Sequence, residues 1–88
     1  MPEFDWDEGN VDHLDRHGVT PEEVEEALMD SRRVGTAAYN APGERRSAVV
    51  GATEDGRLLF VVYTWRGRKV RVVTARDADQ AQRRRYRR

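Results

Sequence analysis

The spacing of apolar residues changes from a helical to a strand-like period near residue 31, and this change limits the chain to folds that mix both elements. Before it, Val11 and Leu14 lie three residues apart, and Val24, Ala27 and Leu28 repeat at helical spacing. After it, apolar and polar residues alternate in short runs bounded by turn residues. The pattern predicts two N-terminal helices followed by a sheet.

The second helix has a clear start signal. Thr20 can cap its first turn, Pro21 suits the first helical position, and Glu23 completes a capping box. Gly18 ends the preceding helix, which is expected over residues 8–16. The second helix is expected to end near residue 30, with Val24, Ala27 and Leu28 as its buried stripe.

Four later segments have strand-like patterns: residues 33–39, 45–52, 58–65 and 69–75. The third is the most apolar and is expected to be central. Residues 4–6 form a short first strand or an extended lead-in, and residues 77–88 form a terminal helix capped by Asp77 or Asp79. We therefore expect an α+β fold in one domain, residues 1–88: two N-terminal helices, a three- to four-stranded antiparallel sheet and a C-terminal helix.

Length and composition exclude several classes of protein. The chain has 88 residues and no cysteine, which rules out disulfide scaffolds, thiolate metal sites and cysteine nucleophiles. Its longest apolar run is too short to span a bilayer, and acidic residues stand where a signal peptide needs positive charge. Phosphate-loop, dinucleotide and serine-hydrolase motifs are absent. We expect a cytoplasmic protein without a cofactor or a membrane partner.

The formal net charge of zero hides two halves of opposite sign. Residues 1–30 hold eleven Asp/Glu and one Arg, a net charge of −10, and residues 31–88 carry a net charge of +10. This asymmetry indicates a basic half that meets a polyanion or an acidic half that faces a partner. The acidic second helix argues against reading the helix pair as a DNA-binding helix-turn-helix, because four glutamates would face phosphates.

Two arginines occupy strand faces beside apolar residues. Arg46 precedes Ala48 and Val50 on its strand face, and Arg71 shares a face with Val73. Each is expected either to pair with Glu44 or the acidic helices, or to meet phosphate on an open sheet face. Arg71 and Arg76 lie five residues apart, so alternation places them on opposite faces unless a bulge or the strand end intervenes.

His13 and His17 stand four residues apart, which is the spacing of two metal ligands on one helix face. The metalloprotease motif HExxH is absent and no third ligand is evident, so no metal site is expected. A structural role for the pair and a role in acid–base chemistry both remain open, since histidine titrates near neutral pH. Tyr63, Trp65 and Tyr86 are candidates for stacking on bases, and the first two are equally suited to packing at the edge of the core.

Short motifs along nearly the whole chain resemble the BrnT-type toxins. At the N-terminal end they are Phe4-Asp5-Trp6-Asp7, Asn10 and His17-Gly18-Val19 before a capped helix. Further along they are Arg46 before Gly51, Gly56-Arg57-Leu58-Leu59, Thr64, Arg66-Gly67, Arg71-Val72-Val73-Thr74-Ala75-Arg76, Ala78 and Tyr86. The chain departs from the family pattern at Gly9, Thr74 and Gln82, where Lys, Ser and Glu are common.

The resemblance implies a RelE-like fold and a toxin of a type II toxin–antitoxin system. Such a toxin is a metal-independent endoribonuclease that inhibits translation. Its partners would be RNA and a cognate BrnA-type antitoxin with a ribbon-helix-helix part, and operator DNA would be reached only through that antitoxin. The alternative is a non-catalytic module on the same fold that binds RNA or protein.

Cleavage of RNA by its own 2′-hydroxyl needs a base, an acid and cations that stabilise the charged transition state. Arginine stays protonated, so it serves as the cation. His17 is the first candidate for base or acid and Tyr86 the second, with His13 and Glu44 also possible. The predicted catalytic residues are His17, Arg46, Arg71, Arg76 and Tyr86. The predicted RNA-binding residues are Arg45, Arg57, Arg66, Arg68, Lys69 and Arg84.

Overall fold

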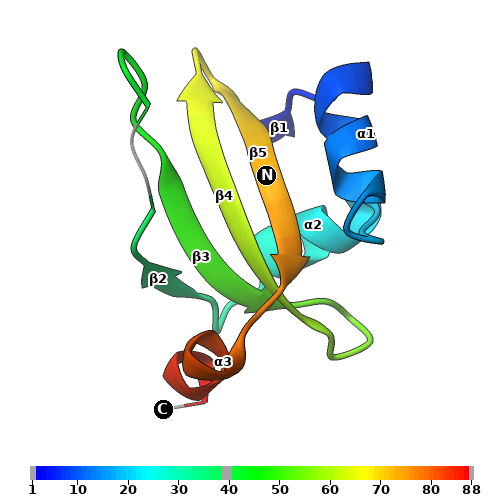
Figure 1. Cartoon of the computed structure of the whole chain (residues 1–88), viewed down its shortest axis with the longest axis vertical. Helices are drawn as coiled ribbons and strands as arrows, with labels where there is room; N and C mark the ends of the chain where they lie inside the picture. The colour runs from blue at the N-terminus through cyan, green and yellow to red at the C-terminus, as the bar shows by residue number, and fades with distance from the viewer. Residues whose placement is uncertain (1, 39–40, 88) are drawn as a thin grey trace.

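A computed structural model describes residues 2–38 and 41–87 and shows an α+β fold (Figure 1). Its elements in chain order are β1 (Glu3–Phe4), α1 (Glu8–Asp15), α2 (Pro21–Met29), β2 (Val34–Thr36), β3 (Ser47–Ala52), β4 (Leu58–Arg66), β5 (Lys69–Asp77) and α3 (Gln80–Tyr86). The predicted α+β class is confirmed. None of the helices in the described residues is long and apolar enough to cross a membrane.

All three helices begin with a capping box. In α2 the Thr20 hydroxyl accepts from the Glu23 backbone N–H and the Glu23 carboxylate accepts from Thr20 N–H, as predicted. Asp79 rather than Asp77 caps α3. Three helix boundaries differ from the prediction: α1 ends at Asp15, and α3 begins at Gln80 and ends at Tyr86. Gly18 adopts the left-handed conformation that separates α1 from α2.

The sheet has five strands in the order β1-β5-β4-β3-β2, with the apolar strand β4 in the centre as predicted. Four strands are antiparallel, but β1 pairs in parallel with β5, which corrects the expected three- to four-stranded antiparallel sheet. Asp5 N–H extends this pairing by donating to the Val70 carbonyl at 2.8 Å. A two-residue strand is too short for periodicity to reveal its direction. The predicted strand over residues 33–39 is also shorter, at Val34–Thr36, and Tyr39 lies outside the described residues.

One face of the sheet, here called the back face, is covered by α2 and by α1 at the β5 edge (Figure 1). Leu14, Val24 and Ala27 of the helices are fully buried against it. Leu28, which is expected in the buried stripe of α2, is only half-buried, as is Val11 of α1, whereas Val19 between the helices is buried. The fit is close, because a Cβ on Gly51 of β3 would collide with the Ala27 carbonyl oxygen of α2.

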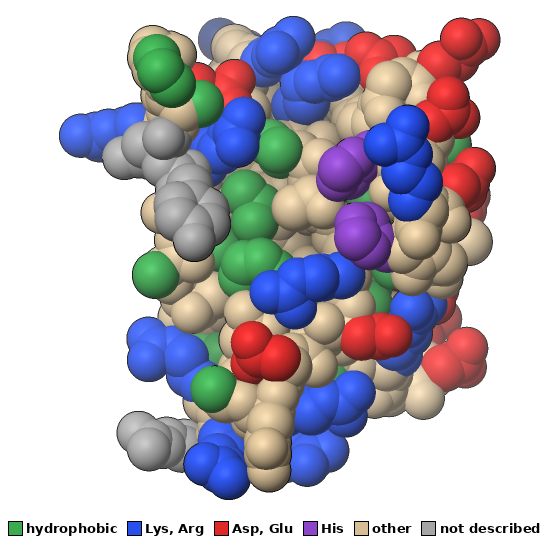
Figure 2. Space-filling view, in the orientation of Figure 1, with side chains coloured by type: hydrophobic (Ala, Val, Ile, Leu, Met, Phe, Trp, Pro, Cys, Tyr) green, Lys and Arg blue, Asp and Glu red, His purple; other side chains and the backbone are tan. Residues whose placement is uncertain are grey.

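Within residues 2–38 and 41–87, the opposite face, here called the front face, is covered by a helix only at one end. There α3 packs on β3 and β2, and Ala78 and Tyr86 contact a small cluster around Val50 and Leu58. Figure 2 shows the rest of this face, with hydrophobic side chains in the middle, arginine or lysine around them and both histidines alongside. The front face is therefore the open side of the sheet.

A β-bulge in β5 decides which arginines reach the front face. Tyr63 pairs with Val72 and Val62 pairs with Thr74, so Val73 has no cross-strand partner. Because of this extra residue, the alternation of β5 side chains between the two faces of the sheet shifts by one position. Arg71, opposite Thr64, and Arg76, opposite Phe60, consequently lie on the same face, and not on the opposite faces that unbroken alternation predicts.

Candidate functional site

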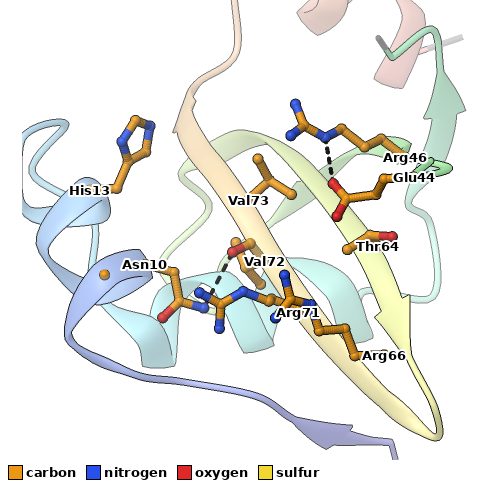
Figure 3. A pocket seen from close by; sticks show the side chains of 10 residues that line it. Asn10, His13, Glu44, Arg46, Thr64, Arg66, Arg71, Val72 and Val73 are labelled. Atoms are coloured by element: carbon orange, nitrogen blue, oxygen red, sulfur yellow. Dashed lines mark hydrogen bonds and ion pairs between the residues drawn. The ribbon is translucent and has the colours of Figure 1, made fainter. Parts of the chain in front are cut away.

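A hollow of about 240 Å³ opens on the front face where α1, β4 and β5 meet. We call it the Arg66 hollow after a lining residue of β4. Figure 3 shows His13 and Asn10 of α1 on one side of β5, and Glu44 and Arg46, from the segment before β3, on the other. The hollow thus gathers side chains that are distant in the sequence.

Three arginines line the Arg66 hollow, and two of them are held by carboxylates. Arg46 Nε donates to Glu44 Oε1 at 2.8 Å, and both side chains are about 30% exposed or less. Arg71 donates to both Asp7 oxygens, at 2.9 and 3.2 Å, and lies 3.5 Å from Asp5. Arg66 is exposed, and no salt bridge to it is found among residues 2–38 and 41–87.

The Arg71–Asp7 pair joins β5 to the start of α1, because Asp7 is also the N-cap of that helix. Hydrogen bonding to Asp7 raises the pKa of the Arg71 guanidinium, and the same bond, with the Asn10 N–H, lowers the pKa of Asp7. Both groups are therefore held in their charged forms.

His13 lines the Arg66 hollow, whereas His17 does not. The His13 Nε2 lies 3.0 Å from the Thr74 hydroxyl on β5. His17 follows the end of α1, is exposed, and makes an edge-to-face contact with the His13 ring at 5.5 Å between centroids. The geometry favours His13 over His17, the first candidate from the sequence, for contact with a ligand in the hollow.

Asn10 is a residue of the hollow that sequence reasoning did not assign to the site. It is buried, and its amide nitrogen donates to the Asp5 carbonyl at 2.9 Å and to the Val72 carbonyl at 3.3 Å. Its side-chain oxygen accepts from Asp7 N–H. These bonds fix α1 beside β5 and so fix the position of His13. The Asp7-x-x-Asn10 capping pattern was the available signal.

A second hollow of about 500 Å³ adjoins the first, and we call it the Phe60 hollow. Arg46 and Val73 line both hollows. Arg76 lies in the second one, with its Cζ 4.5 Å from the centroid of the Phe60 ring and its Nη1 donating to the Gln82 side-chain oxygen at 3.3 Å. The bulge at Val73 thus places the two hollows side by side.

Tyr86, the second candidate for acid–base work, lies in neither hollow. Its hydroxyl donates to Asp30 Oδ2 at 2.6 Å, beyond the end of α2. That hydrogen bond and burial raise the pKa of Tyr86. The arrangement ties α3 to α2, and it makes the phenol harder to deprotonate.

The other predicted RNA-binding residues lie outside the Arg66 hollow. Arg57 is bound by Asp77 at 2.7 Å and Glu23 at 3.0 Å, and it also donates to the Gly18 carbonyl. Arg84 lines a separate depression on α3. The remaining three, at or near the β4–β5 turn and before β3, are exposed: Arg45, Arg68 and Lys69. Of the predicted basic set, the structure therefore brings Arg46, Arg66 and Arg71 together.

The chemistry of the Arg66 hollow is that of an anion site with titratable neighbours. Three guanidinium groups can bind a phosphate through paired hydrogen bonds. His13 and Glu44 can exchange protons with a bound ligand. Within the described residues, no group of three or more His, Asp or Glu could hold a metal ion.

A family model described as "Ribonuclease toxin, BrnT, of type II toxin-antitoxin system" matches residues 6–82. A search of curated proteins found no significant match. The matched range contains the whole lining of the Arg66 hollow.

Proposed function

The chain belongs to the BrnT family of ribonuclease toxins of type II toxin–antitoxin systems, and from that premise we propose that it cleaves RNA in the Arg66 hollow. The observation that carries the proposal is the convergence of Arg46, Arg66 and Arg71 with His13 in one hollow of about 240 Å³. Phosphate is the part of RNA that such a hollow fits, and a histidine beside it supplies proton transfer at neutral pH.

The proposed reaction uses the 2′-hydroxyl of the substrate as the nucleophile. Glu44 accepts the 2′-hydroxyl proton while the 2′-oxygen bonds to phosphorus, and His13 donates a proton to the departing 5′-oxygen. Arg46 and Arg66 stabilise the charge that develops on the phosphate oxygens. The products are a 2′,3′-cyclic phosphate and a 5′-hydroxyl. None of these steps requires a metal ion.

Arg71 has two functions in this proposal. Its guanidinium adds positive charge to the hollow, and its bonds to Asp7 and Asp5 hold the start of α1 beside β5. Arg76 is assigned to the adjoining Phe60 hollow. Tyr86 is assigned a structural role, because its hydroxyl is engaged by Asp30 outside both hollows.

The wider biological role follows from the family. We propose that RNA cleavage inhibits translation in the cytoplasm and that a BrnA-type antitoxin with a ribbon-helix-helix part neutralises the toxin. Operator DNA would then be bound through the antitoxin. A RelE-like fold in one domain over residues 1–88 belongs to the same proposal, and the α+β arrangement of a sheet with three helices supports it.

The alternative is a binding module on the same fold that has lost its chemistry. One observation favours it: Arg71 and Arg46 are already paired with carboxylates in this structure, which lowers the net positive charge of the hollow. A module of this kind would retain RNA at low salt, with affinity falling as salt rises, and would leave the RNA intact.

Two matched variants test the proposal. Purified protein is incubated with end-labelled RNA in the presence of EDTA, and His13→Asn is compared with His17→Asn, since the two rings touch but only His13 lines the hollow. We expect cleavage by the unmodified protein in EDTA, about a 100-fold slower rate for His13→Asn, and a change below about twofold for His17→Asn.

The product ends and the folding of each variant complete the test. Cyclic phosphate and 5′-hydroxyl ends are expected, and thermal denaturation must show that both variants fold. RNA that stays intact but is retained at low salt would establish the binding module. A larger loss in His17→Asn than in His13→Asn would move the proton-transfer site out of the hollow.

A further inference from the structure

We propose that the Phe60 hollow binds the nucleobase adjacent to the cleaved phosphate. This inference rests on the proposed function, because it takes the Arg66 hollow as the phosphate site. It assigns a ligand class, a single unpaired base, to a part of the front face that the family description leaves without a role.

The size and lining of the hollow suit a base. Its volume of about 500 Å³ falls within the range of about 300–1,000 Å³ that is typical of small-molecule sites. Ala37, Ala38, Phe60, Val62 and Val73 make its wall largely apolar. An apolar wall with few polar groups is the usual environment of a bound ring.

The polar groups in the hollow are those that recognise bases. Arg76 Cζ lies over the Phe60 ring at 4.5 Å from its centroid, so a guanidinium and an aromatic face lie together in the hollow. RNA-binding proteins hold unpaired bases by stacking them on aromatic rings or on guanidinium planes. The Gln82 amide and the Thr74 hydroxyl also line the hollow and offer hydrogen bonds to a base edge.

The two hollows adjoin each other, which indicates that the phosphate and the base of the bound RNA are also adjacent. Arg46 and Val73 line both, so a phosphate bound by Arg46 in the Arg66 hollow lies directly beside a ring in the Phe60 hollow. In RNA, a phosphate and the base of the nucleotide attached to it are neighbours in the same way. The Thr74 hydroxyl strengthens the link, since it contacts His13 of the first hollow while it lines the second.

An apolar side chain of a protein partner is the other occupant that the wall would accept. The Phe60–Arg76 pair favours a base, because a guanidinium stacks well on a base ring and gains less from an aliphatic side chain. The test therefore separates binding of a base from binding of phosphate alone.

The experiment uses a 2′-O-methyl RNA tetranucleotide, which cannot be cleaved, and four versions of it that are each abasic at one position. Affinities for the full-length protein are measured by calorimetry. We expect removal of one particular base to weaken binding about tenfold or more, because stacking of a base on an aromatic side chain has an effect of this size. Removal of the other bases should matter less.

Two variants locate the effect. In Phe60→Leu, which keeps an apolar side chain but loses the ring, the penalty for the abasic position should disappear. Trp65→Leu is the matched control, since Trp65 is 57% exposed and lies outside both hollows, and it should keep the full penalty. Thermal denaturation checks both for folding. If Phe60→Leu does not fold, a uniform abasic series on the unmodified protein still overturns the inference.

Several results would overturn the inference. These are an abasic series that binds uniformly, a penalty that persists in Phe60→Leu, or no binding of the tetranucleotide. Uniform binding would leave the hollow to a protein partner. Failure of the proposed function looks different: base-dependent binding would remain, while unmodified RNA would stay intact.

Discussion

The back face of the sheet is closed by apolar packing, whereas the front face is shaped by ion pairs and hydrogen bonds around two hollows. On the back, Leu59, Val61 and Ala75 have no exposed surface, and the helices seal them from water. On the front, Arg46, Arg71 and Arg76 are all held by side-chain partners and all line a hollow. The two faces of one sheet therefore differ: the back face contributes the larger apolar core, whereas the front face carries the charged side chains that line the hollows.

The same comparison explains the charge pattern of the sequence. The acidic segment of residues 1–30 includes α2, whose glutamates lie on the back side of the sheet. The basic segment supplies Arg66 of β4 and Arg71 and Arg76 of β5, which line the hollows of the front face with Arg46 from the segment before β3. Under the proposed function, the front face is therefore the side expected to meet RNA.

The largest expected effect is on the back face, where the fit between α2 and β3 is closest. In Gly51→Ala the new Cβ meets the Ala27 carbonyl oxygen, so α2 must move away from the sheet. We expect a loss of about 3 kcal/mol or more in the free energy of unfolding, measured by chemical denaturation.

Gly35→Ala is the control for this prediction. A Cβ at Gly35 in β2 meets nothing within 4 Å, so the change should be neutral or slightly stabilising. Equal losses in the two variants would show that α2 does not pack closely on β3 and would remove the distinction between the faces.

The next prediction compares two arginines that are each paired with two carboxylates. Arg71 is bound by Asp5 and Asp7 in the Arg66 hollow, and Arg57 by Glu23 and Asp77 outside it. Both Ala variants should lower the melting temperature to a similar extent. Only Arg71→Ala should also lower RNA cleavage, by about 100-fold per folded molecule.

The outcome is read from melting curves and cleavage rates on the same samples. A destabilised but fully active Arg71→Ala would reduce Arg71 to a structural role. A comparable loss of activity in Arg57→Ala would mean that the active surface extends beyond the front face.

The smallest expected effect concerns Tyr86, which joins α3 to Asp30. Tyr86→Phe removes a hydrogen bond of 2.6 Å to a carboxylate and should cost about 1 kcal/mol of stability at neutral pH. Activity per folded molecule should not change, because Tyr86 lies outside both hollows. A tenfold loss of activity in a stably folded variant would return Tyr86 to the catalytic set.

The pH dependence of that cost has a definite sign. Burial disfavours ionisation of Asp30, but hydrogen bonds from Tyr86 and from the Ala52 and Arg32 N–H groups outweigh it and lower its pKa. A carboxylate with a lowered pKa adds stability above its unfolded pKa of about 4, and that stability is lost as pH falls through the folded pKa. The cost of Tyr86→Phe, measured in denaturant at several pH values, should therefore shrink in acid.

Local signals predicted most of the fold. The capping box at Thr20 and Glu23 and the left-handed Gly18 depend on adjacent residues, so the sequence contains their full physical cause. The parallel pairing of β1 with β5 depends on contacts between residues more than 60 positions apart, such as Phe4 with Val70. A strand of two residues is too short to show a periodicity from which this pairing could be predicted.

For the candidate site, the sequence predicted which types of residue are present better than it predicted where they lie. The sequence indicated Arg46, Arg66 and Arg71, but it could not place Arg71 and Arg76 on one face without the bulge. His17 is the first candidate from the sequence because histidine titrates near neutral pH, but the same property applies to His13, so only their positions in the structure distinguish the two. The helix ends at Asp15, so His17 belongs to the following turn and lies outside the hollow.

The bulge at Val73 gives the protein one position where the open surface can change independently of the strand ladder. Val73 is the extra residue between two regular cross-strand pairs, and its side chain stands at the boundary of the two hollows. A larger or smaller side chain at position 73 would change the boundary between the Arg66 hollow and the Phe60 hollow. Deletion of Val73 would leave the cross-strand pairs Tyr63–Val72 and Val62–Thr74 in place. A substitution at Val73 therefore changes the shape of both hollows without removing a regular cross-strand pair.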